Sequence, residues 1–181
     1  MSNLLLKNFK NKKVLITGHT GFKGAWLSLW LKMLDANVIG VALDPISNPT
    51  LYSEANIASD ISDLRVDIRD HQNLEKAVKK FRPDYIFHLA AQAIVKESYE
   101  NPLQTWETNV IGTINVLNAI RKLDNRCNAV LITSDKCYEN REWVLGYRET
   151  DKLGGIDPYS GSKAAAEIAI NSFIRSFFQV S

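Results

Sequence analysis

Tyr159 and Lys163 have the residue types and the spacing of an acid–base pair. Pro158 suits the first position of a helix and Asp157 suits its cap, so the i, i+4 spacing places both side chains on one helical face. A fixed lysine cation lowers the pKa of a neighbouring phenol from its usual value of about 10, and a bound cationic cofactor would lower it further. The phenol then becomes a usable base for a hydroxyl group. A solvent-exposed pair with the same spacing is the alternative.

The run Ser134-Asp135-Lys136 supplies a second group of polar side chains. It follows a predicted strand at 129–133 and adds an acid and a potential base at the edge where that strand ends. A lysine base must be neutral, and the positive charge of Lys163 would push the pKa of Lys136 down. The alternative is that Asp135 caps a helix or turn and that Lys136 is solvated.

Three glycines, Gly18, Gly21 and Gly24, follow an apolar run that begins at Lys13. The pattern predicts a strand, a tight turn and a helix whose free N–H groups and dipole would hold a pyrophosphate. The spacing G-x-x-G-x-x-G is shifted by one from the usual dinucleotide motif, so the flanking strand and helix carry the prediction. Lys23 could neutralise the phosphates, or it could be an ordinary solvated lysine.

The elements that would position these groups alternate between strand and helix periods along the whole chain. Such alternation predicts parallel strands joined by right-handed crossovers, and so a Rossmann-type doubly wound α/β sheet of order 3-2-1-4-5 in one domain, residues 1–181. The two tryptophans of the first helix, Trp26 and Trp30, are expected in the core, and the turn-rich stretch 46–62 is expected to be a functional loop. The predicted strands are 14–17, 37–43, 63–66, 85–91 and 129–133, and the predicted helices are 22–34, 73–81, 102–123 and 158–178.

In such a sheet the ligand lies beyond the carboxyl ends of the strands, where the strand order reverses. Asp44 ends the second strand. A carboxylate there accepts hydrogen bonds from the ribose hydroxyls and repels a 2′-phosphate, so it favours NAD over NADP. The alternative is that Asp44 is only a turn aspartate before proline. Asp67 could lie near the adenine, while Asp70 could do so or cap the next helix. The predicted cofactor-binding residues are Gly18, Thr20, Gly21, Phe22, Lys23, Gly24, Asp44, Asp67, Ile68, Leu89, Ala90, Ala91, Thr133, Tyr159 and Lys163.

Composition restricts the possible partners. The 181 residues are 45% hydrophobic and 23% charged, with a net charge of +2 and scattered basic residues, which indicates a small-molecule partner rather than nucleic acid or a membrane surface. The longest apolar stretch is too short to span a bilayer, so a cytoplasmic protein is expected. Cys127 and Cys137 lack metal-site spacing and the histidines are scattered, so both thiols are expected to be reduced and no metal is expected.

Four segments together resemble the extended short-chain dehydrogenase/reductase superfamily, which includes the NAD-dependent epimerases and dehydratases of sugar nucleotides. They are residues 17–24, 88–92, 108–113 and the Tyr159-x-x-x-Lys163 pair. Within that group, residues 18–26, 133–138, 142–143 and 146–149 resemble the CDP-glucose 4,6-dehydratase family. That resemblance implies an NAD-dependent hydro-lyase that makes CDP-4-keto-6-deoxyglucose for bacterial surface polysaccharides, including lipopolysaccharide O-antigen.

The same resemblance implies catalytic roles. Asp135 would protonate the hydroxyl that leaves C6, and Lys136 would take the C5 proton. Ser134 would hydrogen-bond the C4 oxygen beside Tyr159, with Lys163 next to it. The related dTDP-glucose dehydratases carry glutamate where Lys136 stands. A 4-epimerase or decarboxylase, and a catalytically silent NAD-binding protein, are the alternatives.

Members of this family continue beyond the point where this sequence stops, with further strands and a smaller nucleotide-sugar domain. The chain is therefore expected to be a fragment or a truncated product that is inactive alone. The residues that recognise the cytosine base would lie in the part that is missing. The long helix from about Pro102 and the last helix from Pro158 are expected to form a homodimer contact in the full protein.

Overall fold

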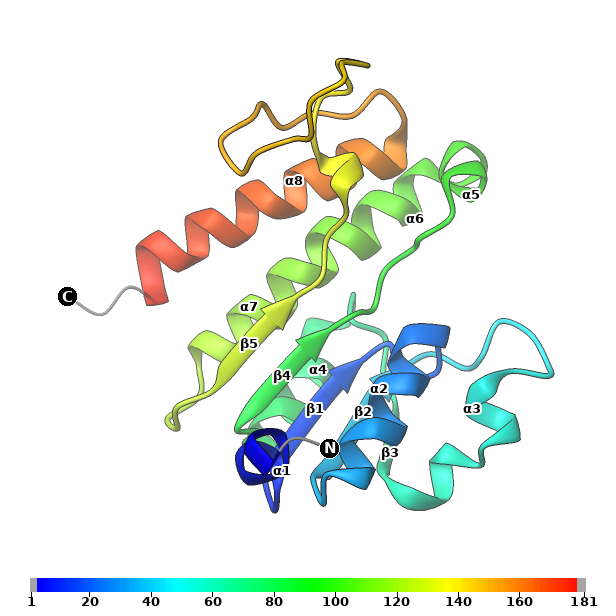
Figure 1. Ribbon diagram of the computed structural model, residues 1–181, viewed down its shortest axis with the longest axis vertical. Helices are drawn as coiled ribbons and strands as arrows, with labels where there is room; N and C mark the ends of the chain where they lie inside the picture. Colours follow the sequence, from blue (N-terminus) through cyan, green and yellow to red (C-terminus); the bar gives the residue numbers. More distant parts are fainter. Residues whose placement is uncertain (1–2, 179–181) are drawn as a thin grey trace.

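The computed structural model describes residues 3–178, which form a five-stranded parallel sheet flanked by helices (Figure 1). The strand order is β3-β2-β1-β4-β5, which confirms the predicted doubly wound topology. β1 lies at the centre because its residues are apolar on both faces, as strands covered on both sides require. The strands are β1 (Lys13–Thr17), β2 (Asn37–Ala42), β3 (Ser62–Arg65), β4 (Tyr85–His88) and β5 (Asn128–Leu131).

The register aligns the carboxyl ends of the three central strands. Thr17, the last residue of β1, is paired with Val41 on one side and with His88 on the other. The strand order reverses between β1 and β4, so the loops after these two strands diverge to opposite faces. Residues that follow β1, β2 and β4 therefore meet at one edge, where the sequence predicts the site.

Helices cover both faces of the sheet (Figure 1). Alternate residues of β1 belong to different cores: Leu15 packs in the cluster with α4 and α7, and Val14 and Ile16 pack in the cluster with α2. The helical elements are α1 (Asn3–Phe9), α2 (Phe22–Met33), α3 (Leu51–Glu54), η1 (Ile57–Asp60), α4 (His71–Phe81), α5 (Val95–Glu100), α6 (Pro102–Trp106), η2 (Glu107–Ile111), α7 (Gly112–Arg121), η3 (Asp135–Cys137), α8 (Pro158–Phe173) and η4 (Ile174–Phe178).

The predicted helix at 102–123 is one continuous helical stretch made of α6, the π-helical turn η2 and α7. It lies beside α8 (Figure 1). The helices α1 and α5 were not expected from the sequence pattern. In α1, Phe9 packs its ring 5.1 Å from that of Tyr85, and this contact covers one end of the sheet.

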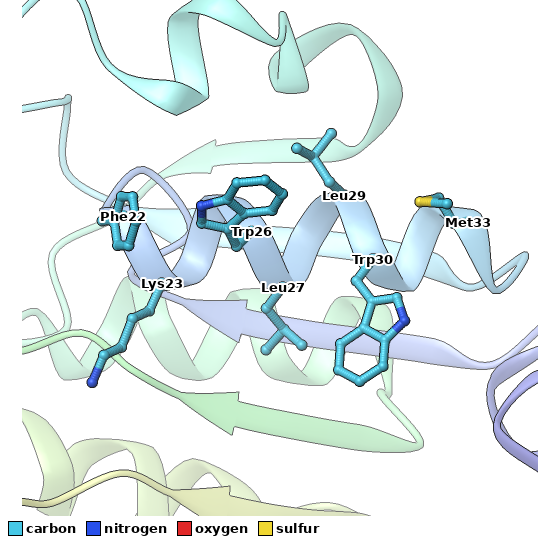
Figure 2. Close-up of a pocket in the computed structure, with 7 residues that line it drawn as sticks. All are labelled: Phe22, Lys23, Trp26, Leu27, Leu29, Trp30 and Met33. Atoms are coloured by element: carbon cyan, nitrogen blue, oxygen red, sulfur yellow. The ribbon is translucent and has the colours of Figure 1, made fainter. Parts of the chain in front are cut away.

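The prediction that Trp26 and Trp30 lie in the core is wrong. They are 55% and 47% exposed, because the buried positions of α2 are Gly24, Ala25, Ser28 and Leu31, and Leu31 packs in the cluster with β1 and β2. Neither tryptophan occupies one of these buried positions. Figure 2 shows them spread along α2, where the side chains that line a shallow apolar hollow are Phe22, Lys23, Trp26, Leu27, Leu29, Trp30 and Met33.

β5 is an edge strand within the described residues, and most of it is exposed. Val130 is 45% exposed and Ile132, just beyond the strand, is 40% exposed. Among residues 3–178, no helix is long and apolar enough to cross a membrane. The same residues contain no cluster of three or more potential metal ligands of the His, Cys, Asp and Glu types.

Candidate active site

The turn after β1 is possible only with glycine at two positions. Gly18 has a φ of 78°, and its N–H donates to the carbonyl of Val41 at 2.8 Å. A Cβ at Gly18 would lie 2.7 Å from the backbone N of Ala90, and a Cβ at Gly24 would lie 2.1 Å from the carbonyl oxygen of Gly18. The turn is therefore wedged between β2, the loop after β4 and the first turn of α2.

Gly21 keeps the outer side of this turn open. It is the N-cap of α2, and a Cβ there would meet only the carbonyl oxygen of Gly18, at 3.4 Å. The first N–H groups of a helix have no intrahelical partner and carry the positive end of the dipole. An anionic group such as a diphosphate fits this cradle, which a side chain at Gly21 would fill. Phe22 and Lys23 are exposed beside it.

The end of β2 is tied to the same turn. The Thr20 hydroxyl donates to the carbonyl of Leu43 at 3.0 Å, immediately before Asp44. The Asp44 side chain is 86% exposed and accepts a hydrogen bond from Arg65 Nε on Oδ1, at 2.7 Å. The carboxylate therefore stands at the edge beside the glycine turn, and a partner on β3 holds it in place.

The loop after β3 holds Asp67 by its own turn. Asp67 accepts from the backbone and the guanidinium of Arg69. Burial opposes ionisation of Asp67, but these hydrogen bonds and the Arg69 charge hold its pKa below the usual value. The Ile68 side chain is buried against Gly112, so only its main chain is left to face the edge. Asp70 caps α4, which confirms one of its two predicted roles.

A buried chain of hydrogen bonds begins at the end of β1. The Ala90 N–H donates to the Thr17 hydroxyl at 3.2 Å, and that hydroxyl lies 2.7 Å from His88 Nδ1. His88 Nε2 lies 2.9 Å from the Thr113 hydroxyl, which itself donates to the Asn109 carbonyl at 2.8 Å. Thr113 must therefore accept from Nε2–H. In the neutral imidazole, Nδ1 is then the acceptor and the Thr17 hydroxyl donates to it.

Burial lowers the pKa of His88 to about 3, and the nearby charge of Lys163 acts in the same direction. The histidine is thus a fixed structural connector and does not exchange a proton near neutral pH. It ties β1, β4 and α7 together beneath the loop that contains the predicted cofactor-binding residues Leu89, Ala90 and Ala91.

Asn109 carries this network to the last helix. It lies in the π-helical turn η2, a type of distortion common at functional sites, and it is 1% exposed. Its side chain accepts from the N–H of Gln92 and donates to the carbonyl of Gln92 and to Ser162 Oγ, each at 2.9 Å. Ser162 donates in turn to the carbonyl of Tyr159 at 2.7 Å. The position of Tyr159 is therefore coupled to the loop after β4.

Tyr159 and Lys163 lie one turn apart on α8, and they are only 8% and 6% exposed. The alternative of a solvent-exposed pair is therefore wrong. Asp157 caps the helix by accepting from the Ser160 N–H at 2.9 Å, as the sequence predicts. Burial lowers the pKa of Lys163, Glu167 raises it by its negative charge, and Lys23 lowers it by its positive charge. The effect of Lys23 indicates that the glycine turn and α8 border the same region.

The segment after β5 packs against α8. Thr133 donates its hydroxyl to Glu167, one turn beyond Lys163. Ser134 caps η3, because its Oγ accepts from the Lys136 N–H at 3.2 Å while donating to Asp135 at 3.0 Å. The cap is thus Ser134 and not Asp135. The side chains of Asp135 and Lys136 are exposed, and η3 packs against α8.

Sequence reasoning missed three contributors to this site: His88, Asn109 and Arg65. His88 and Asn109 lie within segments 88–92 and 108–113, which carry the family resemblance. The signal that could have identified them is a polar residue inside an otherwise apolar segment. Arg65 ends a weak strand and has no signal in the local pattern.

The sheet topology, the glycine turn at the first strand and the buried Tyr159/Lys163 pair define a Rossmann-fold protein of the extended short-chain dehydrogenase/reductase class. A family model described as GDP-mannose 4,6 dehydratase matches residues 15–178. The chain belongs to this family.

Two curated relatives illustrate the range of the family. The chain is 48% identical over 174 residues to CDP-glucose 4,6-dehydratase of Salmonella typhimurium, covering 95% of this chain and 48% of that protein. It is 29% identical to CDP-paratose 2-epimerase of Salmonella typhi, covering 91% of this chain and 54% of the relative. The chain thus spans about half the length of the curated relatives it matches.

Solved structures agree on the fold. UDP-glucose 4-epimerase of Thermotoga maritima, solved with UDP-glucose, has a TM-score of 0.80 at 28% identity over 92% of this chain and 52% of that chain. UDP-glucose 4-epimerase of Thermus thermophilus, solved with NAD, has a TM-score of 0.75 at 30% identity, with 92% and 52% covered.

Proposed function

We propose that this chain is the NAD-binding and proton-transfer half of a CDP-glucose 4,6-dehydratase. The observation that carries the proposal is the placement of Asp135 and Lys136 on η3, which packs against the helix bearing the buried Tyr159 and Lys163. The 48% identity to a dehydratase supports the choice of reaction and of CDP-glucose.

NAD fits the residues present. The helix N-terminus at Gly21 would bind the diphosphate. Asp44 would accept hydrogen bonds from the ribose hydroxyls, and Asp67 with the Ile68 main chain would contact the adenine. The segment 89–91, Thr133, Tyr159 and Lys163 would border the nicotinamide half. When bound, NAD supplies the acceptor for the C4 hydrogen and later returns a hydride to C6.

Side chains of this protein would carry out the proton transfers to and from the sugar. Tyr159 takes the proton of the C4 hydroxyl, and the Lys163 ammonium stabilises the phenolate that Tyr159 must first become. Ser134 donates a hydrogen bond to the C4 oxygen as it becomes a carbonyl. The new C4 carbonyl acidifies the C5 hydrogen, which Lys136 would remove as the base. Asp135 would protonate the C6 hydroxyl, which leaves as water as the C5–C6 double bond forms. When the hydride returns to C6, the protonated Lys136 would give its proton back to C5, so that the product is the substrate less one water.

Two other functions compete with this one. A nucleotide-sugar 4-epimerase or decarboxylase would use the same Tyr159/Lys163 pair, and an NAD-binding protein without activity would need neither proton carrier of η3. The Asp135-Lys136 sequence disfavours both, since an epimerase requires no acid for a leaving hydroxyl.

We also propose a location for the protein. Cys127 and Cys137 are free thiols, which suits a reducing compartment such as the cytoplasm.

A homodimer is proposed from the surface of the helices. Exposed apolar residues on adjacent helices suit a homodimer contact through α6–α7 and α8; they are Leu103, Ile111 and Ile168. The sequence pattern also puts Leu117 on an apolar stripe of this helix, but Leu117 is 1% exposed and packs within its own subunit, so it does not belong to that contact. A role in surface-polysaccharide and O-antigen synthesis follows if CDP-glucose is the substrate.

The proposal is tested by incubating the full-length gene product with NAD and, separately, with CDP-glucose, UDP-glucose and dTDP-glucose. We expect NMR of the products to show a 4-keto-6-deoxy sugar from CDP-glucose at a rate well above the other two. Formation of the C4 epimer would establish the epimerase alternative. NAD binding without any product would establish the silent binding protein.

A further inference from the structure

A cluster of charged and polar side chains lies behind Asp44 and is not used in the proton transfers described above. Its centre is Arg65, the last residue of β3. Arg65 Nε donates to Asp44 Oδ1 at 2.7 Å, and Arg65 Nη2 donates to the Tyr52 hydroxyl at 2.6 Å. Both Nη groups also donate to Asp63. One guanidinium therefore connects the exposed ribose-binding carboxylate to partners behind it.

The partners behind the guanidinium fix its position. Asp63 is 17% exposed in its side chain and also accepts from the Tyr52 hydroxyl and from His19 Nε2. The guanidinium lies 5.3 Å from the centre of the Tyr52 ring, within the range of a cation–π contact. Charge-assisted and bidentate hydrogen bonds of this kind are the strong ones. Loss of the Asp44 contact would therefore leave Arg65 where it is.

The cluster is also tied to the dinucleotide turn. His19 is 0% exposed and packs against Gly40, where an added Cβ would lie 2.5 Å from the imidazole ring. His19 is flanked by Gly18 and Thr20, so Arg65 is held at a set distance from the turn that would receive the diphosphate. In a dinucleotide the adenosine ribose links the diphosphate to the adenine, so a ribose bound here would have its 2′ position on the side of the Asp44–Arg65 pair.

We infer that Arg65 determines cofactor selectivity together with Asp44: it orients the carboxylate that accepts the ribose 2′-hydroxyl, and it becomes a 2′-phosphate site when that carboxylate is removed. This inference rests on the proposed NAD site. In the natural chain, the Asp44 charge both occupies Nε of Arg65 and repels a 2′-phosphate. Selection of NAD over NADP thus depends on the Asp44 carboxylate, which occupies a guanidinium that could otherwise bind a phosphate.

A merely structural role for Arg65 makes a different prediction. If Arg65 only tied β3 to the end of β2, its loss would lower stability and weaken NAD and NADP alike. If it sets selectivity, the ratio of the two dissociation constants must change. This ratio is therefore the decisive quantity.

The test measures NAD and NADP affinities of the full chain by calorimetry for the wild type, Asp44→Ser, Asp44→Ser/Arg65→Gln and Asp44→Ser/Arg121→Gln. We expect Asp44→Ser to tighten NADP binding by about tenfold or more, the scale of one hydrogen-bonded charge pair, while NAD binding weakens. The Arg65→Gln double variant should lose that gain. The Arg121→Gln control should keep it, because Arg121 ends α7 and its guanidinium bonds Asn118 instead.

Two results would overturn the inference while leaving the proposed NAD site intact: unchanged NADP affinity in Asp44→Ser, or a gain that survives Arg65→Gln. Wild-type protein that binds neither dinucleotide would overturn the NAD site itself and the inference with it. If the double variant does not fold, a crystal structure of Asp44→Ser with NADP decides the matter. Arg65 must then lie within hydrogen-bond distance of the 2′-phosphate, and any other position refutes its role.

Discussion

Asn109 donates a hydrogen bond to Ser162 at 2.9 Å, and this contact joins the π-helical turn of one helix to the helix that carries Tyr159. The same amide side chain satisfies both main-chain groups of Gln92. A single residue thus fixes α8 relative to the loop after β4. Both the loop and the helix carry residues of the proposed nicotinamide site.

We predict that Asn109→Ala lowers the free energy of unfolding by about 2–3 kcal/mol, because it leaves the buried polar groups that Asn109 contacts without a hydrogen-bond partner. Urea unfolding of the chain measures this value. Asn118→Ala, a change on the more accessible side of the same helix, is the matched control and should cost well under half as much. Equal losses for the two variants would show that the Asn109 network contributes no special stability.

We predict that acidification destabilises the fold well before the carboxylates titrate. Burial lowers the pKa of His88 from 6.5 to about 3, so between pH 6.5 and 5 the unfolded chain binds a proton that the folded chain does not. The free energy of unfolding must therefore fall as the pH falls, with a contribution from His88 that approaches about 1.4 kcal/mol per pH unit. Burial shifts the pKa of His19 in the same direction. Urea unfolding across this range measures the slope, and His88→Gln should remove the His88 contribution. A slope unchanged by His88→Gln would contradict the neutral, buried assignment of His88.

We predict that Lys136→Ala and Tyr159→Phe block different steps in the full-length gene product. Lys136 is assigned to the C5 proton, so Lys136→Ala should leave C4 oxidation partly intact while abolishing exchange of the C5 hydrogen with solvent deuterium and loss of water. Tyr159→Phe should suppress C4 oxidation itself, by roughly 10²–10⁴-fold for a lost general base. Rapid-mixing absorbance of the reduced cofactor and NMR of the sugar separate the two. Normal exchange at C5 in Lys136→Ala would refute the role of that lysine.

We predict that stability contributions along α2 follow contact with the sheet and not side-chain hydrophobicity. Leu31 is 1% exposed and Met33 is 66% exposed on the same helix. Leu31→Ala should cost about 2–5 kcal/mol in urea unfolding, whereas Met33→Ala should cost at most about 1 kcal/mol. Comparable costs would mean that the outer surface of α2 is covered in solution.

The sequence was sufficient for features that depend on local chemistry. The strand order followed from alternating periods, the helix caps at Asp70 and Asp157 followed from residue type, and the Tyr159/Lys163 pair followed from i, i+4 spacing. Burial along α2 did not follow, because the hydrophobic residues of this helix outnumber its buried positions.

Contacts between distant segments were also beyond local patterns. Thr17 and His88 are 71 positions apart, His88 and Thr113 are 25 apart, and Arg65 and Asp44 are 21 apart. The first and third contacts exist because parallel strands bring their carboxyl ends to one edge, and the second exists because α7 packs on the sheet beside β4. The direction of the hydrogen bonds through His88 further requires knowing that Thr113 donates to the Asn109 carbonyl.

The most direct test of the proposed dehydratase follows one hydrogen atom. The full-length gene product is incubated with NAD and CDP-glucose carrying deuterium at C4, and the product is analysed by NMR and mass spectrometry. The proposed chemistry predicts that the deuterium appears in the C6 methyl group of a 4-keto-6-deoxy sugar, because the hydride removed from C4 is the one returned to C6. Deuterium retained at C4, or a product that keeps its C6 hydroxyl, would contradict the assignment of this chain to a 4,6-dehydratase.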